Sequence, residues 1–177
     1  MSAGSSVLQG AMVGAALLAA LAAPAQAEEQ TVTAFSVWLV EGEVVQTGEN
    51  SATFAGVLKG RVYVETERGP VPAGIMSCPA AIDIELDTGR QRGEARCAFL
   101  AEDQSQLYAD LRCDGVHLVG CNGTFAITGG SGRFAEITGN GPVIIRGDFH
   151  KITLDHAGLS ESVAGIMYWP ELRYTLP

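Results

Sequence analysis

The sequence predicts an all-β fold, a single antiparallel β-barrel of about eight strands in meander order, preceded by a signal peptide. Three observations predict this fold. Beyond residue 27, apolar and polar residues alternate with a period of two, whereas no stretch of a dozen residues has apolar side chains at helical spacing. Turn residues such as Asp87-Thr88-Gly89 separate the alternating segments. Glycine is abundant, with 22 of 177 residues, and this favours a closed barrel over a sandwich.

The first 27 residues differ in composition from the rest of the chain. An uncharged run over residues 11–23 is followed at residues 24–27 by Pro-Ala-Gln-Ala, which has the small residues of a cleavage site. The apolar run is shorter than the roughly 20 residues that a membrane-spanning helix needs. The sequence therefore predicts a signal peptide over residues 1–27, one barrel domain over residues 28–177, and a periplasmic or secreted protein without membrane insertion after cleavage.

The charge balance limits the classes of partner. The chain has a formal net charge of −9, and none of it lies in the leader. The 11 lysine and arginine residues form no cluster, so the sequence argues against binding to nucleic acid or to anionic membranes. About 150 residues after the leader are enough for one domain with a core of its own.

The alternating segments can be placed along the chain. The clearest one, at residues 81–87, puts Ile82 and Ile84 on one face and acidic residues on the other. Glycine-containing or polar turns are predicted at residues 102–105 and 139–141. The predicted strands are residues 32–40, 52–58, 61–67, 81–87, 94–100, 107–113, 123–128, 142–149, 150–154 and 162–169.

The four cysteines of an exported chain are expected to form two disulfides. Cys78, Cys97, Cys113 and Cys121 are each in phase with apolar neighbours, so all four are predicted to face the same side of the sheet. In a meander, neighbouring strands lie about 4.8 Å apart, and a disulfide needs Cα atoms within about 7 Å. Pairing Cys78 with Cys97 and Cys113 with Cys121 meets this limit. Pairing Cys97 with Cys113 would leave Cys78 and Cys121 three strand spacings apart, and in the crossed pairing each bond would have to skip a strand. A zinc site is the weaker alternative because no C-x-x-C motif occurs.

Residues 123–141, GTFAITGGSGRFAEITGNG, are predicted to form a strand, a glycine turn, a second strand and a second turn. Residues 130–135 formally match the G-x-G-x-x-A motif of dinucleotide-binding proteins. That motif requires a helix after the glycines, and further glycines and a proline follow too soon here, so no cofactor is predicted. The glycines assigned to structural turns are Gly129, Gly130, Gly132, Gly139 and Gly141.

The same run resembles a known family signature. Thr124 and Phe125, then Ile127 and Thr128, the GGSGRF turn, and finally Ile137 and Gly139 resemble the hairpin of the allene oxide cyclase and dirigent-like β-barrel families. The resemblance is strongest over residues 113–141 and weaker over residues 78–97. It implies an antiparallel barrel with an apolar cavity; the plant enzymes of this group are trimers that bind lipid oxides or guide phenoxy-radical coupling. The cysteines depart from the plant pattern and suggest an exported bacterial branch, and no functional residue can be carried over.

The histidines suggest no metal site and no catalytic residue. His150 and His156 lie near Asp148 and Asp155 in sequence, but in an extended strand the two histidines are roughly 20 Å apart and cannot share a metal. His117 falls in the loop between two cysteines, where we expect it to be exposed to solvent. The catalytic residues, if the protein has any, are left unassigned.

Three further features have structural interpretations. The acids at 83, 85 and 87 are predicted to form a solvated outer face. Asn122-Gly123-Thr124 is a glycosylation sequon, relevant only in a host that glycosylates exported proteins. Trp169, in an aromatic tail, is predicted to pack on the barrel or at its mouth, with a ligand-stacking role as the alternative.

The sequence thus favours an exported, disulfide-braced barrel that binds a small apolar ligand or serves as a structural or interaction module, without catalysis. The alternative is a cyclase or isomerase that works by confining its substrate. Either a binder or an enzyme needs a cavity of about 300 Å³ or more, whereas a structural module would have a filled interior. An inhibitor or adhesion protein would show an apolar surface patch instead. The ligand, the reaction and assembly into a homo-oligomer are left open.

Overall fold

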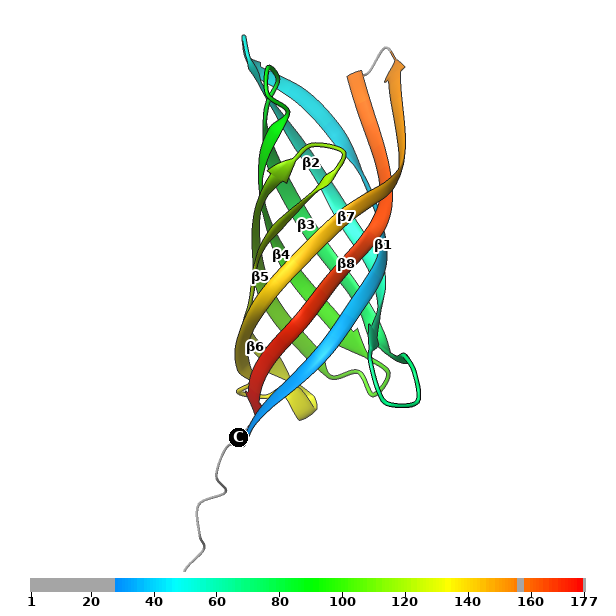
Figure 1. The fold of residues 1–177 in the computed structure, drawn as a ribbon, viewed down its shortest axis with the longest axis vertical. Helices are drawn as coiled ribbons and strands as arrows, with labels where there is room; N and C mark the ends of the chain where they lie inside the picture. Colours follow the sequence, from blue (N-terminus) through cyan, green and yellow to red (C-terminus); the bar gives the residue numbers. More distant parts are fainter. Residues whose placement is uncertain (1–27, 156–157, 177) are drawn as a thin grey trace, which may run out of the picture.

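A closed antiparallel barrel is formed by residues 28–155 and 158–176, the parts of the chain that the computed structural model describes (Figure 1). Each strand pairs with its neighbours in sequence, and the last strand pairs with the first to close the sheet. The predicted fold class is confirmed, while the predicted signal peptide over residues 1–27 lies outside the described residues. The strands are β1 (Glu28–Gly48), β2 (Ser51–Val64), β3 (Val71–Glu85), β4 (Arg90–Ala101), β5 (Gln106–Val116), β6 (Gly120–Ser131), β7 (Thr138–Asp155) and β8 (Gly158–Leu176), with a short 3-10 helix η1 (Gly132–Phe134) between β6 and β7.

The barrel has two distinct ends (Figure 1). The end that we call the hairpin end carries the β1–β2, β3–β4 and β5–β6 connections, together with the ends of β7 and β8 that face each other. At the opposite end, the termini end, β1 begins, β8 finishes, and η1 lies between β6 and β7. In the part of the chain described, no helix is long and apolar enough to cross a membrane.

Two predicted pairs of strands are each one continuous strand. Residues 52–58 and 61–67 were expected to be separate, but β2 runs through Gly60, which faces inward against Ser36 and Trp38. Residues 142–149 and 150–154 likewise belong to β7, which contains a register shift between Gly147 and Phe149. Glycine interrupts the side-chain pattern at these positions without ending the hydrogen-bonded ladder.

The predicted turn at residues 139–141 is also part of β7. A Cβ atom at Gly139 would collide with the carbonyl of Arg173, and one at Gly141 would collide with the carbonyl of Glu171. These two glycines therefore allow β8 to approach β7 closely, rather than reversing the chain. The turns predicted at residues 87–89 and 102–105 do lie between strands.

The other three glycines lie around the end of β6. Gly129 and Gly130 are its final glycines, and Gly129 has a φ of 152° beside the register shift between Tyr108 and Ala109. Gly132 opens η1 with a φ of 63°, a conformation that side chains with a Cβ rarely adopt. Of the five glycines assigned to turns, Gly132 is the one that lies in the connection itself.

The inside of the barrel combines large aromatic rings with glycines. A Cβ atom on either Gly42 or Gly56 would come within 2.6 Å of the ring of Phe54, so these two glycines make room for it. Gly165 does the same for Trp38, whose ring atom Cζ2 would lie 2.7 Å from such a Cβ. Small residues opposite large ones allow a narrow eight-stranded barrel to be filled by side chains.

Pairs of opposite charge lie on the outer face of β4 and β5. Arg92 on β4 is paired with Asp114 on β5 at 3.0 Å, and Glu94 is paired with Arg112 at 3.5 Å. The hydrogen bond to Asp114 raises the pKa of the Arg92 guanidinium, and the negative charge of Asp114 acts in the same direction. Opposite charges directly across two strands favour this register of the pair. The acids predicted to form a solvated face are also exposed: Asp83, Glu85 and Asp87.

Both disulfides join neighbouring strands from inside the barrel. Cys78 on β3 is bonded to Cys97 on β4, and Cys113 on β5 to Cys121 on β6, with Cα–Cα distances of 4.1 Å and 5.5 Å. This is the pairing that the meander order predicts. All four cysteines are buried, and disulfides of this kind are typical of proteins in oxidising compartments.

Removing each disulfide should destabilise the barrel by a different amount. The Cys78–Cys97 bond closes 19 residues and the Cys113–Cys121 bond closes 8. Loop-closure entropy then predicts that C78A/C97A loses about 3 kcal/mol of unfolding free energy and C113A/C121A about 2.5 kcal/mol. Urea unfolding measures both losses, with the oxidised wild-type protein as the reference. A larger loss for the shorter loop would contradict this explanation.

Candidate functional site

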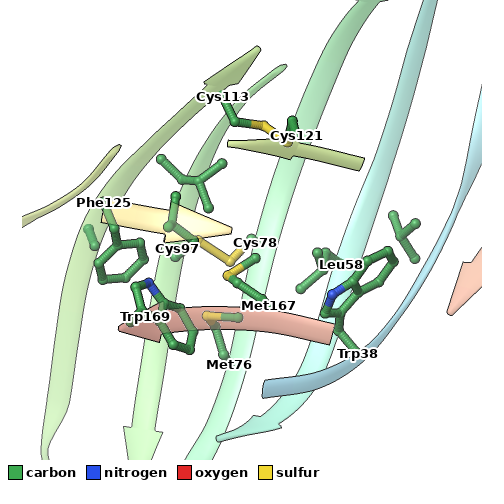
Figure 2. Close-up of a cluster of buried hydrophobic side chains, with 14 of the residues drawn as sticks. Trp38, Leu58, Met76, Cys78, Cys97, Cys113, Cys121, Phe125, Met167 and Trp169 are labelled. Carbon is green, nitrogen blue, oxygen red and sulfur yellow. A yellow bond between two sulfur atoms is a disulfide. The ribbon is translucent and has the colours of Figure 1, made fainter. Parts of the chain in front are cut away.

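A layer of buried side chains divides the barrel interior into two pockets (Figure 2). Cys78 and Met167 line the pocket on the hairpin side of this layer. Met76, Phe125 and Trp169 line the pocket on its other side. We call these five residues the dividing layer; each is less than 5% exposed. The interior is therefore filled in its middle and hollow towards both ends.

The pocket at the termini end is the larger of these two compartments, with a volume of about 350 Å³. The ring of Trp169 packs edge-on against Phe125, with 5.2 Å between the ring centroids. The indole Nε1 of Trp169 is buried and has no hydrogen-bond partner among the described residues. This pocket is thus an apolar space, and one of the residues in its wall holds a buried hydrogen-bond donor without a partner. Its walls are formed by Val32, Ala34, Val62, Val64, Ala73, Met76, Phe99, Leu107, Phe125, Ile127, Arg133, Phe134, Ile137, Trp169, Leu172, Tyr174 and Leu176.

The helix η1 lies at the termini end of this pocket (Figure 1). Its Phe134 lines the pocket and packs edge-on against Phe99 at a centroid distance of 6.1 Å. The backbone N–H of Arg133 donates a hydrogen bond of 3.0 Å to the hydroxyl of Ser105, a buried residue after the β4–β5 turn. The Arg133 guanidinium lies over the Phe134 ring at 4.8 Å. Ser105 therefore connects two loops at this end of the barrel.

Asp103 adds an electrostatic contact to this connection. Its carboxylate accepts a 3.1 Å hydrogen bond from the backbone N–H of Ser105 and lies 3.5 Å from the Arg133 guanidinium. The Ser105 hydrogen bond is the main cause that lowers the pKa of Asp103, and the positive charge of Arg133 lowers it further. Asp103 therefore stays ionised at a lower pH than an ordinary aspartate does. Its ion pair with Arg133 persists while the carboxylate is ionised.

The pocket at the hairpin end is small, about 100 Å³, and polar at its mouth. His117 reaches over this mouth: its Nε2 lies 3.3 Å from Oε2 of Glu161 on β8, and its Nδ1 lies 3.2 Å from Oε1 of Gln91 on β4. The Glu161 side chain is 2% exposed and that of His117 is 21% exposed. The expectation of a solvent-exposed His117 is wrong, because the backbone N–H of His117 bonds to the carbonyl of Gly89 and folds the β5–β6 turn over the barrel.

Three buried polar atoms around this pocket have no hydrogen-bond partner in residues 28–155 and 158–176. They are Oε1 of Glu161, Nδ1 of His150 and Nε1 of Trp38, and all three residues line the pocket. In the same described residues, no group of three or more histidines, cysteines and acids is arranged to hold a metal ion. Asp148 is exposed on β7, and His156 lies outside the described residues.

The sequence alone did not identify the Glu161–His117 contact. Glu161 lies one residue before the predicted strand 162–169, yet it is in phase with the inward-facing Val163, Gly165 and Met167. An acid at an inward position of a strand is the signal that could have revealed it. Trp169, predicted to pack on the barrel or its mouth, lies inside at the dividing layer.

The glycosylation sequon lies on the exposed face of β6. Asn122 is exposed, and its Oδ1 accepts a 3.1 Å hydrogen bond from Arg146 on β7. This contact links two neighbouring strands and gives the asparagine a structural role on the outside of the barrel.

Comparison with known proteins finds a likeness to solved structures. No family model matches this chain, and no curated protein matches it in sequence. A solved structure, that of the pterocarpan synthase dirigent protein, is similar to this chain with a TM-score of 0.40 and 14% sequence identity, over 85% of this chain and 87% of that one. At this level of similarity no residue or activity is transferred, and the exported bacterial branch stays a prediction.

Replacing Ser105 by alanine should loosen η1. The variant leaves the Arg133 N–H without its partner, so we expect a loss of about 1 kcal/mol in unfolding free energy and faster amide exchange at Arg133. Hydrogen exchange followed by NMR measures the second effect residue by residue. The matched control is Ser160→Ala, which removes an exposed hydroxyl at the other end of the barrel. Equal exchange at Arg133 in both variants would contradict the role assigned to Ser105.

Proposed function

We propose that this protein is an exported, disulfide-braced barrel that binds a small apolar ligand in the termini-end pocket. The observation that carries the proposal is the volume of that pocket, about 350 Å³, together with its apolar walls. Ligand sites are usually concave, mostly apolar and at least about 300 Å³ in volume. The two disulfides and the leader-like composition of residues 1–27 support export to an oxidising compartment.

The walls of the pocket define the chemistry of this ligand. Burial of apolar surface supplies the affinity, at about 25 cal/mol per Å² removed from water. The free Nε1 of Trp169 is a donor only, so a ligand with one carbonyl or ether oxygen would satisfy it. A charged ligand would lose its hydration without a paired charge in the inner wall. The proposed ligand is therefore neutral, largely apolar, and carries one hydrogen-bond acceptor.

The alternative function is a cyclase or isomerase that confines its substrate in the same pocket. Among the described residues that line it, the ionisable ones are Arg133 and Tyr174. Arg133 is paired with Asp103, and the hydroxyl of Tyr174 donates to Gln30 at 2.7 Å. Both groups are thus engaged in contacts of their own, which favours binding without catalysis.

Filling the pocket should weaken binding. Ala73 lines the termini-end pocket, so Ala73→Phe places a ring inside it, whereas Ala98→Phe places the same ring on the outer face of β4. The probe is N-phenyl-1-naphthylamine, whose fluorescence increases in apolar surroundings. We expect saturable binding at one site per barrel, weakened about tenfold or more by Ala73→Phe through steric overlap and unchanged by Ala98→Phe. Failure of the wild-type protein to bind the probe, or equal binding by Ala73→Phe, would contradict the proposal.

The indole of Trp169 should recognise the acceptor of the ligand. 2-Acetylnaphthalene and 2-isopropylnaphthalene have nearly the same shape, but the first carries a carbonyl oxygen. We expect the wild-type protein to prefer the ketone by up to about tenfold, the value of one net hydrogen bond, and Trp169→Phe to lose this preference. Trp38→Phe, which alters the other tryptophan, should keep it. Competition against the fluorescent probe measures both affinities, and a preference that survives in Trp169→Phe would refute the assignment.

A further inference from the structure

The buried carboxylate of Glu161 is the starting point for a second site, independent of the termini-end pocket. Glu161 faces inward on β8, and its Oε2 is paired with His117. Its Oε1 is buried and has no partner among the described residues. A buried polar atom without a hydrogen bond is destabilising, and more so when it is charged. A group that enters the hairpin-end pocket and donates to Oε1 would remove this destabilisation.

The contacts of His117 leave one oxygen of Glu161 free. Nδ1 of His117 lies 3.2 Å from Oε1 of Gln91 and donates to it in the tautomer that carries a proton on Nδ1. One further proton lies between His117 Nε2 and Glu161 Oε2, bonded to either atom, because two lone pairs would otherwise face each other at 3.3 Å. In both cases Oε1 is a hydrogen-bond acceptor, either as part of a carboxylate or as the carbonyl oxygen of the acid.

His150 supplies a second polar contact beside Glu161. On β7, His150 lies opposite Val163 and Ile152 lies opposite Glu161, so His150 and Glu161 are diagonal neighbours on the inner face. The residues of such a diagonal pair are about 7–8 Å apart, with their Cβ atoms somewhat closer, so long side chains can reach a common ligand. The unpartnered Nδ1 of His150 donates to the oxygen of such a group when that nitrogen is protonated. A hydroxyl can then donate to Glu161 and accept from His150.

The remaining walls of the pocket are apolar, and the cavity is small. Val40, Leu58, Leu111 and Val163 are among its lining residues. Its volume of about 100 Å³ is less than the roughly 150 Å³ of an engineered apolar cavity that accepts benzene. A molecule with about four or five carbon atoms fits this space. The apolar walls disfavour a charged head group, which would lose its hydration on entering the pocket.

We propose that the hairpin-end pocket is a second binding site, and that its ligand is a small neutral aliphatic alcohol. The hydroxyl lies between Glu161 and His150, and the alkyl chain extends towards the dividing layer. His117 is a positioning residue, because it holds the Glu161 carboxyl through Oε2 and leaves Oε1 for the ligand. The site differs from the termini-end pocket in size, in polarity and in its place on the other side of the dividing layer.

Two isomers test this proposal. 1-Pentanol and butyl methyl ether contain the same atoms, but only the alcohol has an O–H donor. We expect 1-pentanol to cause saturable shifts in the amide NMR signals of Gly147, Glu161 and Val163 in the oxidised protein, with an affinity about tenfold higher than that of the ether. Equal affinities of the two isomers would overturn the proposal. Shifts confined to the termini-end pocket, or none, would also overturn it and would mean that water alone occupies the hairpin-end site.

Two variants of Glu161 distinguish the loss of the hydrogen bond to the ligand from a loss of folding. Glu161→Leu removes the acceptor and should abolish the preference for the alcohol. Glu161→Gln keeps an amide oxygen for the ligand while its NH₂ donates to His117, so it should retain the preference. Near-ultraviolet circular dichroism checks that both variants are folded. Should Glu161→Leu unfold, the affinities of the two isomers for the wild-type protein and for Glu161→Gln still test whether the site prefers the alcohol. Probe binding to the termini-end pocket should be unchanged in Glu161→Gln, so that the two sites succeed or fail separately.

Discussion

Closure of the sheet by the pairing of β8 with β1 is the constraint on which the rest of this structure depends. Eight strands give a barrel whose interior is just wide enough to be filled by side chains. Every large inward residue therefore needs a small one nearby, which explains why Gly42 and Gly56 surround Phe54 and why Gly165 lies under Trp38. Closure also leaves no free sheet edge that could pair with another chain.

The dividing layer turns this narrow interior into two separate spaces. Met76 and Met167 suit such a position, since an unbranched and polarisable side chain adapts to irregular gaps between rings. The Cys78–Cys97 bond crosses between β3 and β4 within the same layer and holds the two strands together where the interior is most crowded. A ligand at one end is thus separated from the other end by packed side chains. Two pockets of different size and polarity can exist in one barrel because its middle is closed.

The general architecture follows from the sequence because it depends on local patterns, whereas the polar site depends on contacts between distant segments. Period-two alternation predicted the strand type, and the meander order predicted which cysteines are bonded. Gly60 and Gly139 misled the prediction, since a glycine that accommodates a neighbouring strand has the same one-letter signature as a glycine in a turn. His117 and Glu161 are 44 positions apart in sequence, and no periodicity relates them. Their contact requires the closed barrel, which brings the β5–β6 turn over the end of β8.

The Cys113–Cys121 bond connects this fold to its polar site. It closes a loop of eight positions that contains His117, so the residue that covers the hairpin end is carried by a segment fixed at both ends. Such a short loop has few conformations even in the unfolded chain, and the hydrogen bond from His117 to Gly89 then selects one of them. In the reduced protein the same loop would keep its sequence but lose its covalent closure. The Cys113–Cys121 bond therefore restrains the segment that holds His117 against Glu161, so the same covalent bond contributes to the stability of the barrel and to the shape of its hairpin-end pocket.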